Sequence, residues 1–359
     1  MKQGRSLEEL AAELTSREKG KRDIIADTRQ IKMLPRLNDV SDEPVLELPN
    51  QDADILDHFD ITQHTHRQIG QRVGIPAKYY DHMLAQAPDL LATNVNHWFA
   101  RQPQRRMVRT LDNRARAFLS DRYRRIDNYE VAEAVLPILL QHEDLHIVSS
   151  EVTEARLYLK VVNRRIEREV KVGDPVQAGI VISNSEIGAG SLSISPMVYR
   201  LVCLNGMISA DNTYRKYHVG ARADTSEAVY ELLTDETREA DDKAILLKVR
   251  DVVSAGLSEA LFDRQVSDMQ ETTERKIEGS VPKAVEVLGS KIGLTDQEQS
   301  GVLHHLIEGS DMSQWGLLNA VTRFAQDVEG YDRATELEKA GGEVLTLPAN
   351  DWEQIARAA

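Results

Sequence analysis

The sequence predicts an α+β fold with an N-terminal helical unit, a central and mostly antiparallel β region with helices, and a C-terminal helical bundle or arm. Short strand-like segments are dense between residues 145 and 219, and Gly, Pro, Asn and Asp separate them. From Thr225 onward, apolar residues recur at three- and four-residue spacing, which is typical of amphipathic helices. Runs of strands followed by runs of helices favour α+β over a doubly wound sheet.

The chain has 359 residues, enough for two or three domains with a sizeable core. We expect four segments along it. They are a mixed, mainly helical region (1–100), an arginine-rich α+β core (101–224), an acidic helical region (225–330) and a short β-α tail (331–359). No apolar run approaches the roughly 18 residues of a membrane span, and the single cysteine excludes an internal disulfide framework. We therefore expect a cytoplasmic protein with no membrane partner.

The N-terminal region predicts several short elements. Ser6 and Glu9 have capping-box spacing and open a helix that extends to about Arg17. The expected elements after it are strands in 21–34 and 45–48 and helices over 61–73, 77–87 and 89–99. Gly74 ends the first of these three helices and Pro76 begins the next. This pattern is typical of a helix-turn-helix, but it also fits a plain helical hairpin, and 77–87 has few donors for base edges.

The central region begins with a predicted β-hairpin, 105–111 and 114–120, turning at Asp112-Asn113. In its second strand Arg114, Arg116 and Phe118 alternate with small apolar residues, so we expect these three on one face. A helix over 127–140 and a series of strands follow; the strands are expected at 145–149, 153–162, 166–172, 176–183, 191–195, 199–208 and 214–219. Helices are then expected up to 268 and over 272–288, 295–308 and 313–329, with a strand at 344–347 and a helix at 351–358.

The arginine content is the strongest functional indication. Between Trp98 and Arg125 the chain carries nine arginines and two acids, although its formal net charge is −14. Guanidinium groups bind phosphate oxygens two at a time, and aromatic rings stack on unpaired bases. We therefore expect the backbone of a nucleic acid to be held by arginines, with Phe118 and Tyr123 stacking on bases. The candidate residues are Arg105, Arg106, Arg109, Arg114, Arg116, Phe118, Arg122, Tyr123, Arg124, Arg125, Arg200, Arg215 and Lys216.

A competing interpretation is that these basic residues pair with acids of the protein. Residues 227–329 contain 21 acids and 10 lysines and arginines. A third basic set on predicted strands and turns comprises Arg156, Lys160, Arg164, Arg165 and Lys171. The sequence leaves both interpretations open, and they are compatible with each other.

Catalytic motifs are weak. The chain has no Walker A loop and no GxGxxG, and the glycines at 188 and 190 are interpreted as a hairpin loop. Cys203 with His218 and Asn205 could form a thiol site, but Cys203 lies in an apolar segment, where cysteine usually packs as a small hydrophobe. The histidines lack metal-ligand spacing. We predict no catalytic residue, no metal and no cofactor, and we favour a non-enzyme.

Three strings resemble a known family. They are RQIGQRVGIPAKYYDHM (67–83), RTLDNRARAFLSDRYRRIDNYEV (109–131) and SNSEIGAGSLSISPMVYRLVCLNGMI (183–208). They are similar to the DUF932 family of phage- and plasmid-encoded proteins, over about residues 7–229. The family has no assigned function, so it supplies no catalytic residues. The resemblance implies a place on mobile elements, often among genes of DNA metabolism.

We therefore hypothesise a phage- or plasmid-type protein that binds single-stranded DNA in an arginine-rich groove and promotes strand annealing or recombination. The acidic helices would mediate homo-oligomer formation and repel DNA from the outer face. One alternative is a protein-interaction module, for example an inhibitor of host defence, whose arginines meet an acidic partner. The other is a metal- or thiol-dependent hydrolase.

Overall fold

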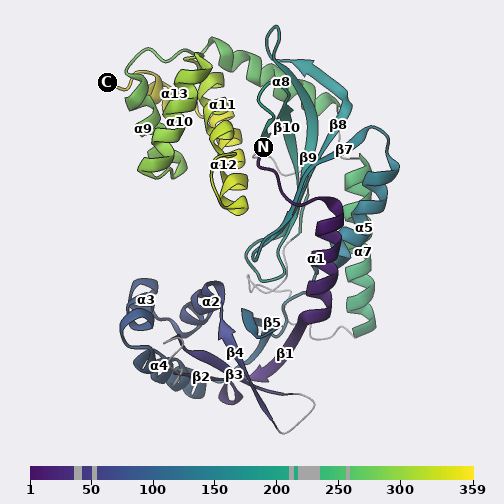
Figure 1. Cartoon of the computed structure of the whole chain (residues 1–359), viewed down its shortest axis with the longest axis vertical. Helices are drawn as coiled ribbons and strands as arrows, with labels where there is room; N and C mark the ends of the chain where they lie inside the picture. The colour runs from purple at the N-terminus through teal and green to yellow at the C-terminus, as the bar shows by residue number, and fades with distance from the viewer. Residues whose placement is uncertain (36–42, 51–54, 210–213, 217–234, 256–258) are drawn as a thin grey trace.

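The computed structural model describes residues 1–35, 43–50, 55–209, 214–216, 235–255 and 259–359. It has an α+β architecture, as predicted, built on two six-stranded sheets that lie in separate lobes (Figure 1). The first lobe comprises the first sheet and the helices α2–α4. The second lobe comprises the second sheet and the remaining helices. Among the described residues, no helix is both long and apolar enough to cross a bilayer.

The first sheet has the strand order β1-β5-β6-β4-β3-β2. Its strands are β1 (Lys21–Asp27), β2 (Lys32–Leu34), β3 (Val45–Pro49), β4 (Leu56–Ile61), β5 (Arg105–Leu111) and β6 (Arg114–Ser120), with a short 3-10 turn at Thr28–Gln30. β4 and β6 run parallel, and the other neighbours are antiparallel. The predicted hairpin 105–120 is present, and it lies in the middle of a sheet whose other strands precede residue 62.

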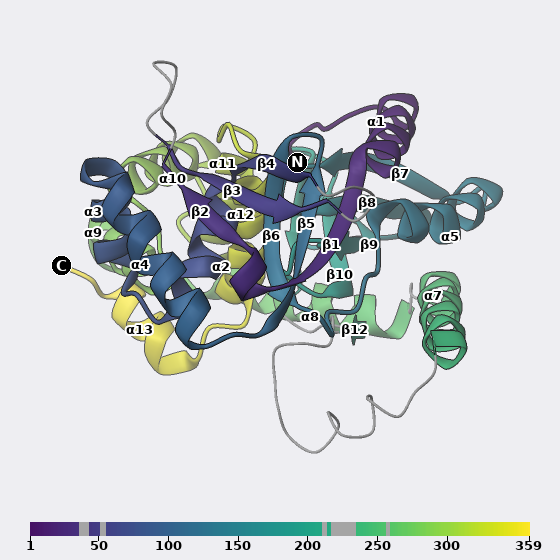
Figure 2. The ribbon, with the colours of Figure 1, turned by 90° about the horizontal axis from the view of Figure 1, so that it is seen from below.

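Three helices cover one face of this sheet: α2 (Gln63–Val73), α3 (Ala77–Gln86) and α4 (Pro88–Arg101). Thr62 caps α2 by accepting a hydrogen bond from the Thr65 amide, and Gly74 ends it with φ of 72°. The apolar sides of the helices meet the sheet in one core that contains Ile69, Val95 and Phe118. Figure 2 shows these helices beside the strands of the first lobe.

The second sheet has the order β11-β10-β9-β8-β7, all antiparallel, with β12 also paired to β10. Its strands are β7 (Leu145–Val152), β8 (Leu157–Glu169), β9 (Pro175–Asn184), β10 (Leu192–Arg200), β11 (Asn205–Ile208) and β12 (Tyr214–Lys216). The expected single strand over 199–208 is wrong. The chain turns at 201–204, where Leu204 has φ of 51°, so Cys203 lies in a turn and is half-buried.

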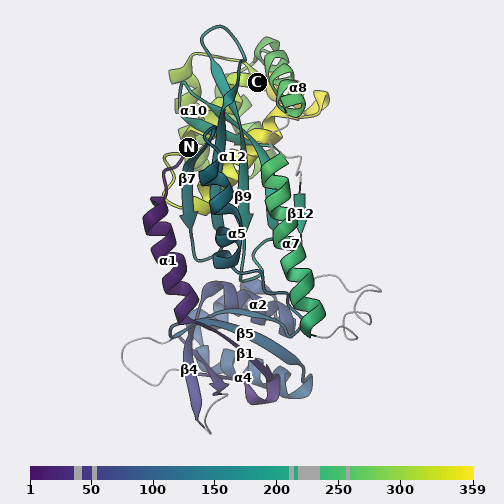
Figure 3. The same ribbon diagram turned by 90° about the vertical axis from the view of Figure 1, so that its right-hand side faces the viewer.

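Helices cover both faces of the second sheet. They are α1 (Leu7–Gly20), α5 (Asn128–Gln141), α7 (Asp235–Ala255), α8 (Glu259–Glu274), α9 (Val281–Ile292), α10 (Asp296–Gly309), α11 (Gln314–Phe324), α12 (Tyr331–Leu345) and α13 (Ala349–Ala356). α1, α5 and α7 share one core with the sheet, and Figure 3 shows α1 and α7 beside it. The strand expected at 344–347 is wrong, because Val344 and Leu345 are buried in the last turn of α12.

Candidate nucleic-acid interface

The seam between the lobes is built from buried charges. The Arg109 guanidinium is fully buried and lies 2.8 Å from carboxylate oxygens of both Asp23 and Asp127. It also donates to the backbone carbonyl of Glu186 at 2.9 Å. Arg116 donates to the Glu186 carboxylate at 2.6 Å. We call these five residues the seam network; it ties β1, β5 and β6 to the loop between β9 and β10.

The ion pairs of the seam network outweigh the cost of burial. Burial raises the pKa of Asp127, but Arg109 and Lys21 more than offset that effect and hold the pKa below its ordinary value. Burial lowers the pKa of Lys21, yet hydrogen bonds to Asp127 and Glu18 leave that pKa raised. Asp127, Lys21 and Arg109 are therefore charged at neutral pH. Removing one partner would leave an uncompensated buried charge.

The structure corrects the expectation that Phe118 and Tyr123 stack on bases. Phe118 is only 3% exposed and stacks on Phe99, with ring centroids 5.4 Å apart. Tyr123 is also buried, and its hydroxyl donates to the Ser185 carbonyl at 3.2 Å. Neither ring has a free face for a nucleotide, because each fills a core.

The predicted arginines separate into buried and accessible groups. Arg109, Arg116 and Arg124 are buried, Arg106 and Arg122 are half-buried, and Arg105, Arg114 and Arg125 are exposed. The continuous groove expected from the full set is wrong for the buried members, whose guanidiniums are taken up inside the protein. Arg114 pairs with Glu154 at 2.6 Å, and Arg125 pairs with Asp23 at 3.3 Å.

Several members of the other basic sets also pair within the chain. Arg200 binds Asp174 at 2.5 Å and lies over the Trp315 ring. The backbones of Arg215 and Lys216 pair with β10, and their side chains lie outside the described residues. Lys160 is fully buried against Glu338 at 2.6 Å. Pairing with acids is therefore common. Among the described side chains, the carboxylates that bind the hairpin arginines come from β1 and from loops of the central region, not from the acidic helices.

A β-bulge in β6 explains how Arg116 is placed. Thr110 pairs with Ala115 and Arg109 with Ala117, so Arg116 has no opposite residue on β5. Strict alternation would put the two alanines on one face. The bulge instead sends Ala115 into the core under α2–α4 and Ala117 into a cluster between the lobes. The expected common face for Arg114, Arg116 and Phe118 is wrong for Phe118, which shares the core with Ala115.

Next to the seam network lies a pocket of about 500 Å³ that both lobes line. We call it the inter-lobe pocket. Four arginines from three elements line it, with three acids and the start of α2. Its lining is Arg17, Thr62, Gln63, His64, Arg67, Leu111, Asp112, Arg114, Arg116, Glu154, Ala155, Ile187 and Asp332. Of the predicted binding arginines whose side chains the structure describes, only Arg114 and Arg116 belong to it.

Several acids of the inter-lobe pocket already have partners. Glu154 pairs with Arg114, and Asp332 accepts hydrogen bonds from Tyr158 at 2.8 Å and Thr153 at 3.2 Å. Asp112 lies on the exposed hairpin turn with φ of 51°. Arg67 is exposed and has no ion-pair partner within the described part of the chain. The pocket therefore has an unpaired cation available to an anionic ligand.

His64 adds a hydrogen bond but no charge to this pocket. Burial lowers its pKa, and the positive charges of Arg67 and Arg156 lower it further. Its Nε2 lies 2.9 Å from the Ile187 carbonyl oxygen and 2.9 Å from the Gln68 amide nitrogen, which itself donates to that carbonyl at 2.9 Å. His64 fixes the loop between β9 and β10 against α2 in this way.

Sequence reasoning missed Arg17, His64, Arg67 and the carboxylates of the seam network. Arg67 is the first residue of the string 67–83 that carries part of the family resemblance. It lies far from the arginine run in the sequence, so the charge pattern did not indicate it. Arg17 reaches the pocket from α1, where it pairs with Glu13 and donates to the Thr153 carbonyl. Contacts of such long sequence separation have no local signal.

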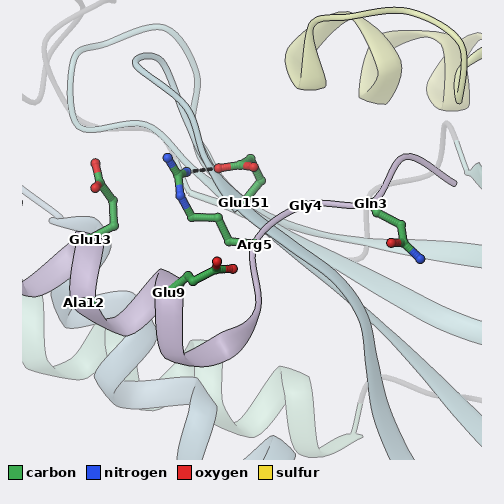
Figure 4. A pocket seen from close by; sticks show the side chains of 7 residues that line it. All are labelled: Gln3, Gly4, Arg5, Glu9, Ala12, Glu13 and Glu151. Atoms are coloured by element: carbon green, nitrogen blue, oxygen red, sulfur yellow. Dashed lines mark hydrogen bonds and ion pairs between the residues drawn. The ribbon is translucent and has the colours of Figure 1, made fainter.

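Two other depressions carry less chemistry. One lies beside the start of α1, where Arg5 pairs with Glu151 (Figure 4). Its other acids are also engaged: Glu9 caps α1, and Glu13 pairs with Arg17. Within the described ranges, no group of three or more His, Cys, Asp or Glu side chains has an arrangement suited to a metal ion.

The second depression, of about 320 Å³, contains Cys203. The Cys203 Sγ lies 3.3 Å from Nη1 of Arg200. The Asn205 side-chain amide donates to Thr322 and Asn319, so it is not available to orient a histidine beside the thiol. His218, the other member of the thiol site that the sequence disfavours, lies outside the described residues.

These features define a two-lobed α+β protein with a polar, arginine-lined pocket between two sheets. The model of a protein family described as "Domain of unknown function (DUF932)" matches residues 116–342, and the chain belongs to this family. The match begins within β6 and ends in α12, so it extends further into the C-terminal helices than the resemblance indicated. No curated protein and no solved structure matches the chain.

Proposed function

We propose that this protein binds single-stranded nucleic acid, DNA in the first instance, with its main contact at the inter-lobe pocket. The observation that carries the proposal is the convergence there of Arg17, Arg67, Arg114 and Arg116, together with the start of α2. Arginines that bind phosphate oxygens supply sequence-independent affinity, and helix N-termini favour anions. This site is more compact than the arginine-rich groove that the sequence led us to expect.

The size of the pocket favours a single strand over a duplex. About 500 Å³ admits a nucleotide-sized group but not a stack of base pairs. Exposed arginines outside the pocket, Arg105 and Arg125, would add weaker long-range attraction to the strand. Residues 227–329, with 21 acids against 10 basic residues, would repel the strand from the other lobe and guide it toward the pocket.

The proposal retains annealing, self-association through the C-terminal helices, and a cytoplasmic location. An annealing protein neutralises two strands and holds their bases exposed, so it needs no catalytic group. Self-association would bring several pockets onto one strand and raise the avidity. Size-exclusion chromatography with light scattering, with and without an oligonucleotide, measures this part separately from binding.

The test is a filter-binding titration with single- and double-stranded oligonucleotides over a range of salt concentrations. Replacing Arg67 and Arg114 by alanine removes two exposed cations, and we expect the log–log salt slope for a single strand to fall by about 1.4. Arg165→Ala is the matched control. Like Arg114, Arg165 is exposed and pairs with one carboxylate, at 2.7 Å, but it lies away from the pocket.

Each outcome decides between functions. A flattened slope for the double variant and an unchanged one for Arg165→Ala supports the proposal. If the double variant and Arg165→Ala gave the same salt slope, the strand would bind somewhere other than the inter-lobe pocket. No retention of any oligonucleotide at low salt would contradict nucleic-acid binding and favour the protein-interaction alternative, in which these arginines meet an acidic partner.

A further inference from the structure

The inner wall of the inter-lobe pocket contains an incompletely satisfied arginine. Arg116 is 7% exposed, and its Nη2 is taken by Glu186 at 2.6 Å. Its Nε–H is buried and has no hydrogen-bond acceptor among the described residues. A buried donor without a partner costs free energy, and because Arg116 lines the pocket, an oxygen of a bound ligand would satisfy its guanidinium. The bulge in β6 puts this side chain there.

The start of α2 contributes donors to the same pocket. Thr62, Gln63 and His64 all line it. The Thr65 amide is bound by the Thr62 side chain and the His66 amide by the Thr62 carbonyl. The amides of Gln63 and His64 lie in the first turn, where no intrahelical acceptor exists, and the helix dipole favours negative charge there.

Arg67 completes this corner of the pocket. It follows Gln63 by four residues, so the two side chains lie on the same face of α2. Glu154 and Asp332, which also line the pocket, have partners of their own, and Asp112 lies on the exposed hairpin turn. An anion with several oxygens could therefore accept hydrogen bonds from Arg116, Arg67 and the α2 amides together.

We propose that this corner binds a phosphomonoester, the terminal phosphate of a nucleic-acid strand. This inference rests on the proposed function and names the part of the strand that enters the pocket. A terminal phosphate carries a charge of about −1.5 to −2 and three free oxygens, more than an internal diester offers. A strand end can also reach a buried arginine without requiring the chain to continue past it.

The test compares single-stranded oligonucleotides of one sequence that carry a 5′-phosphate, a 3′-phosphate or hydroxyls at both ends. We expect one phosphorylated form to bind wild-type protein about tenfold more tightly than the hydroxyl form, the gain from one charge-assisted hydrogen-bond set. Inorganic phosphate should compete away this gain and leave the remaining affinity. Competition that removes all binding would instead indicate general charge screening and overturn the inference.

Two variants locate the effect. Arg67→Ala should abolish the preference for the phosphorylated end, and Arg165→Ala should keep it. Arg116→Lys retains a cation for Glu186 but lacks the Nε–H, and it should reduce the preference; circular dichroism and a urea midpoint establish whether it folds. If it does not fold, the wild-type comparison and Arg67→Ala still decide.

The failures can be told apart. Equal affinity of wild-type protein for all three oligonucleotides overturns the phosphate inference and leaves the proposed function standing. No binding of any of them contradicts the proposed function itself. A preference that Arg67→Ala retains in full would place the terminal phosphate elsewhere and overturn this assignment of the site.

Discussion

The seam network and the inter-lobe pocket use the same residue type in opposite ways. In the seam network, Arg109 is fully buried between Asp23 and Asp127 and holds the lobes together. In the adjacent pocket, Arg67 is exposed and unpaired within the described ranges. The local density of arginine therefore does not measure the positive charge of a surface. The positive charge of a surface depends on whether carboxylates distant in the sequence pair with its guanidinium groups.

The largest expected effect comes from the buried side of this comparison. Arg109→Ala should lower the free energy of unfolding by about 3–5 kcal/mol, because it removes the fully buried guanidinium between Asp23 and Asp127 and leaves these carboxylates only Arg125 and Lys21 as partners. Arg125→Ala is the matched control: Arg125 pairs with the same Asp23 at 3.3 Å but is exposed, so its loss should cost less than about 1 kcal/mol. Urea denaturation measures both, and equal costs would contradict the distinction.

The next expected effect concerns the pH dependence of stability and the buried side of α2, where His66 lies. Burial lowers the pKa of His66 from 6.5 to about 4, although Asp81 opposes this, and its Nδ1 lies 2.8 Å from the Tyr80 hydroxyl. Between these pH values the unfolded chain binds the proton and the folded chain does not. Stability is therefore complete above pH 6.5 and falls as the pH drops toward 4, by up to about 3 kcal/mol.

His66→Gln removes this titration. The variant should show a flatter dependence of the urea midpoint on pH between 6.5 and 4 than wild-type protein. His64 also has a lowered pKa and contributes in the same direction, so some slope should remain. Parallel curves for the two proteins would show that His66 does not control acid stability.

The smallest expected effect concerns Phe118. Because its ring is buried against Phe99, Phe118→Leu should destabilise the fold by about 1–2 kcal/mol through imperfect packing. The folded variant should bind single-stranded DNA within about twofold of wild-type protein. A loss of about 1–3 kcal/mol in binding, the value of one stacked base, would restore the stacking hypothesis for this ring.

Local rules predicted local structure well. The capping box at Ser6 and Glu9, the Gly74 end of α2 and the hairpin at 105–120 are all present, because each depends on neighbours in the sequence. The antiparallel second sheet also followed from its short strands and their turns. Where prediction failed, a local pattern was ambiguous, as at Val344, which lies in a helix instead of the expected strand.

The candidate site was less predictable because it depends on partners far apart in the chain. Arg109 meets Asp23 across β1 and β5, and Arg116 meets Glu186 from the other lobe. No pattern of residue spacing in the sequence predicts either ion pair. The bulge at Arg116 also reverses the alternation on which the expected faces of β6 depended.

That bulge makes Arg116 a supernumerary residue. β5 and β6 keep their partners on both sides of it, with Ala115 still opposite Thr110 and Ala117 still opposite Arg109. A chain that lacked this one position could keep a continuous ladder, the same core side chains and Arg114 in its place. A difference of a single codon in the length of β6 would thus add or remove the guanidinium on the inner wall, and with it the partner of the buried Glu186 carboxylate, while the ladder between β5 and β6 stays continuous.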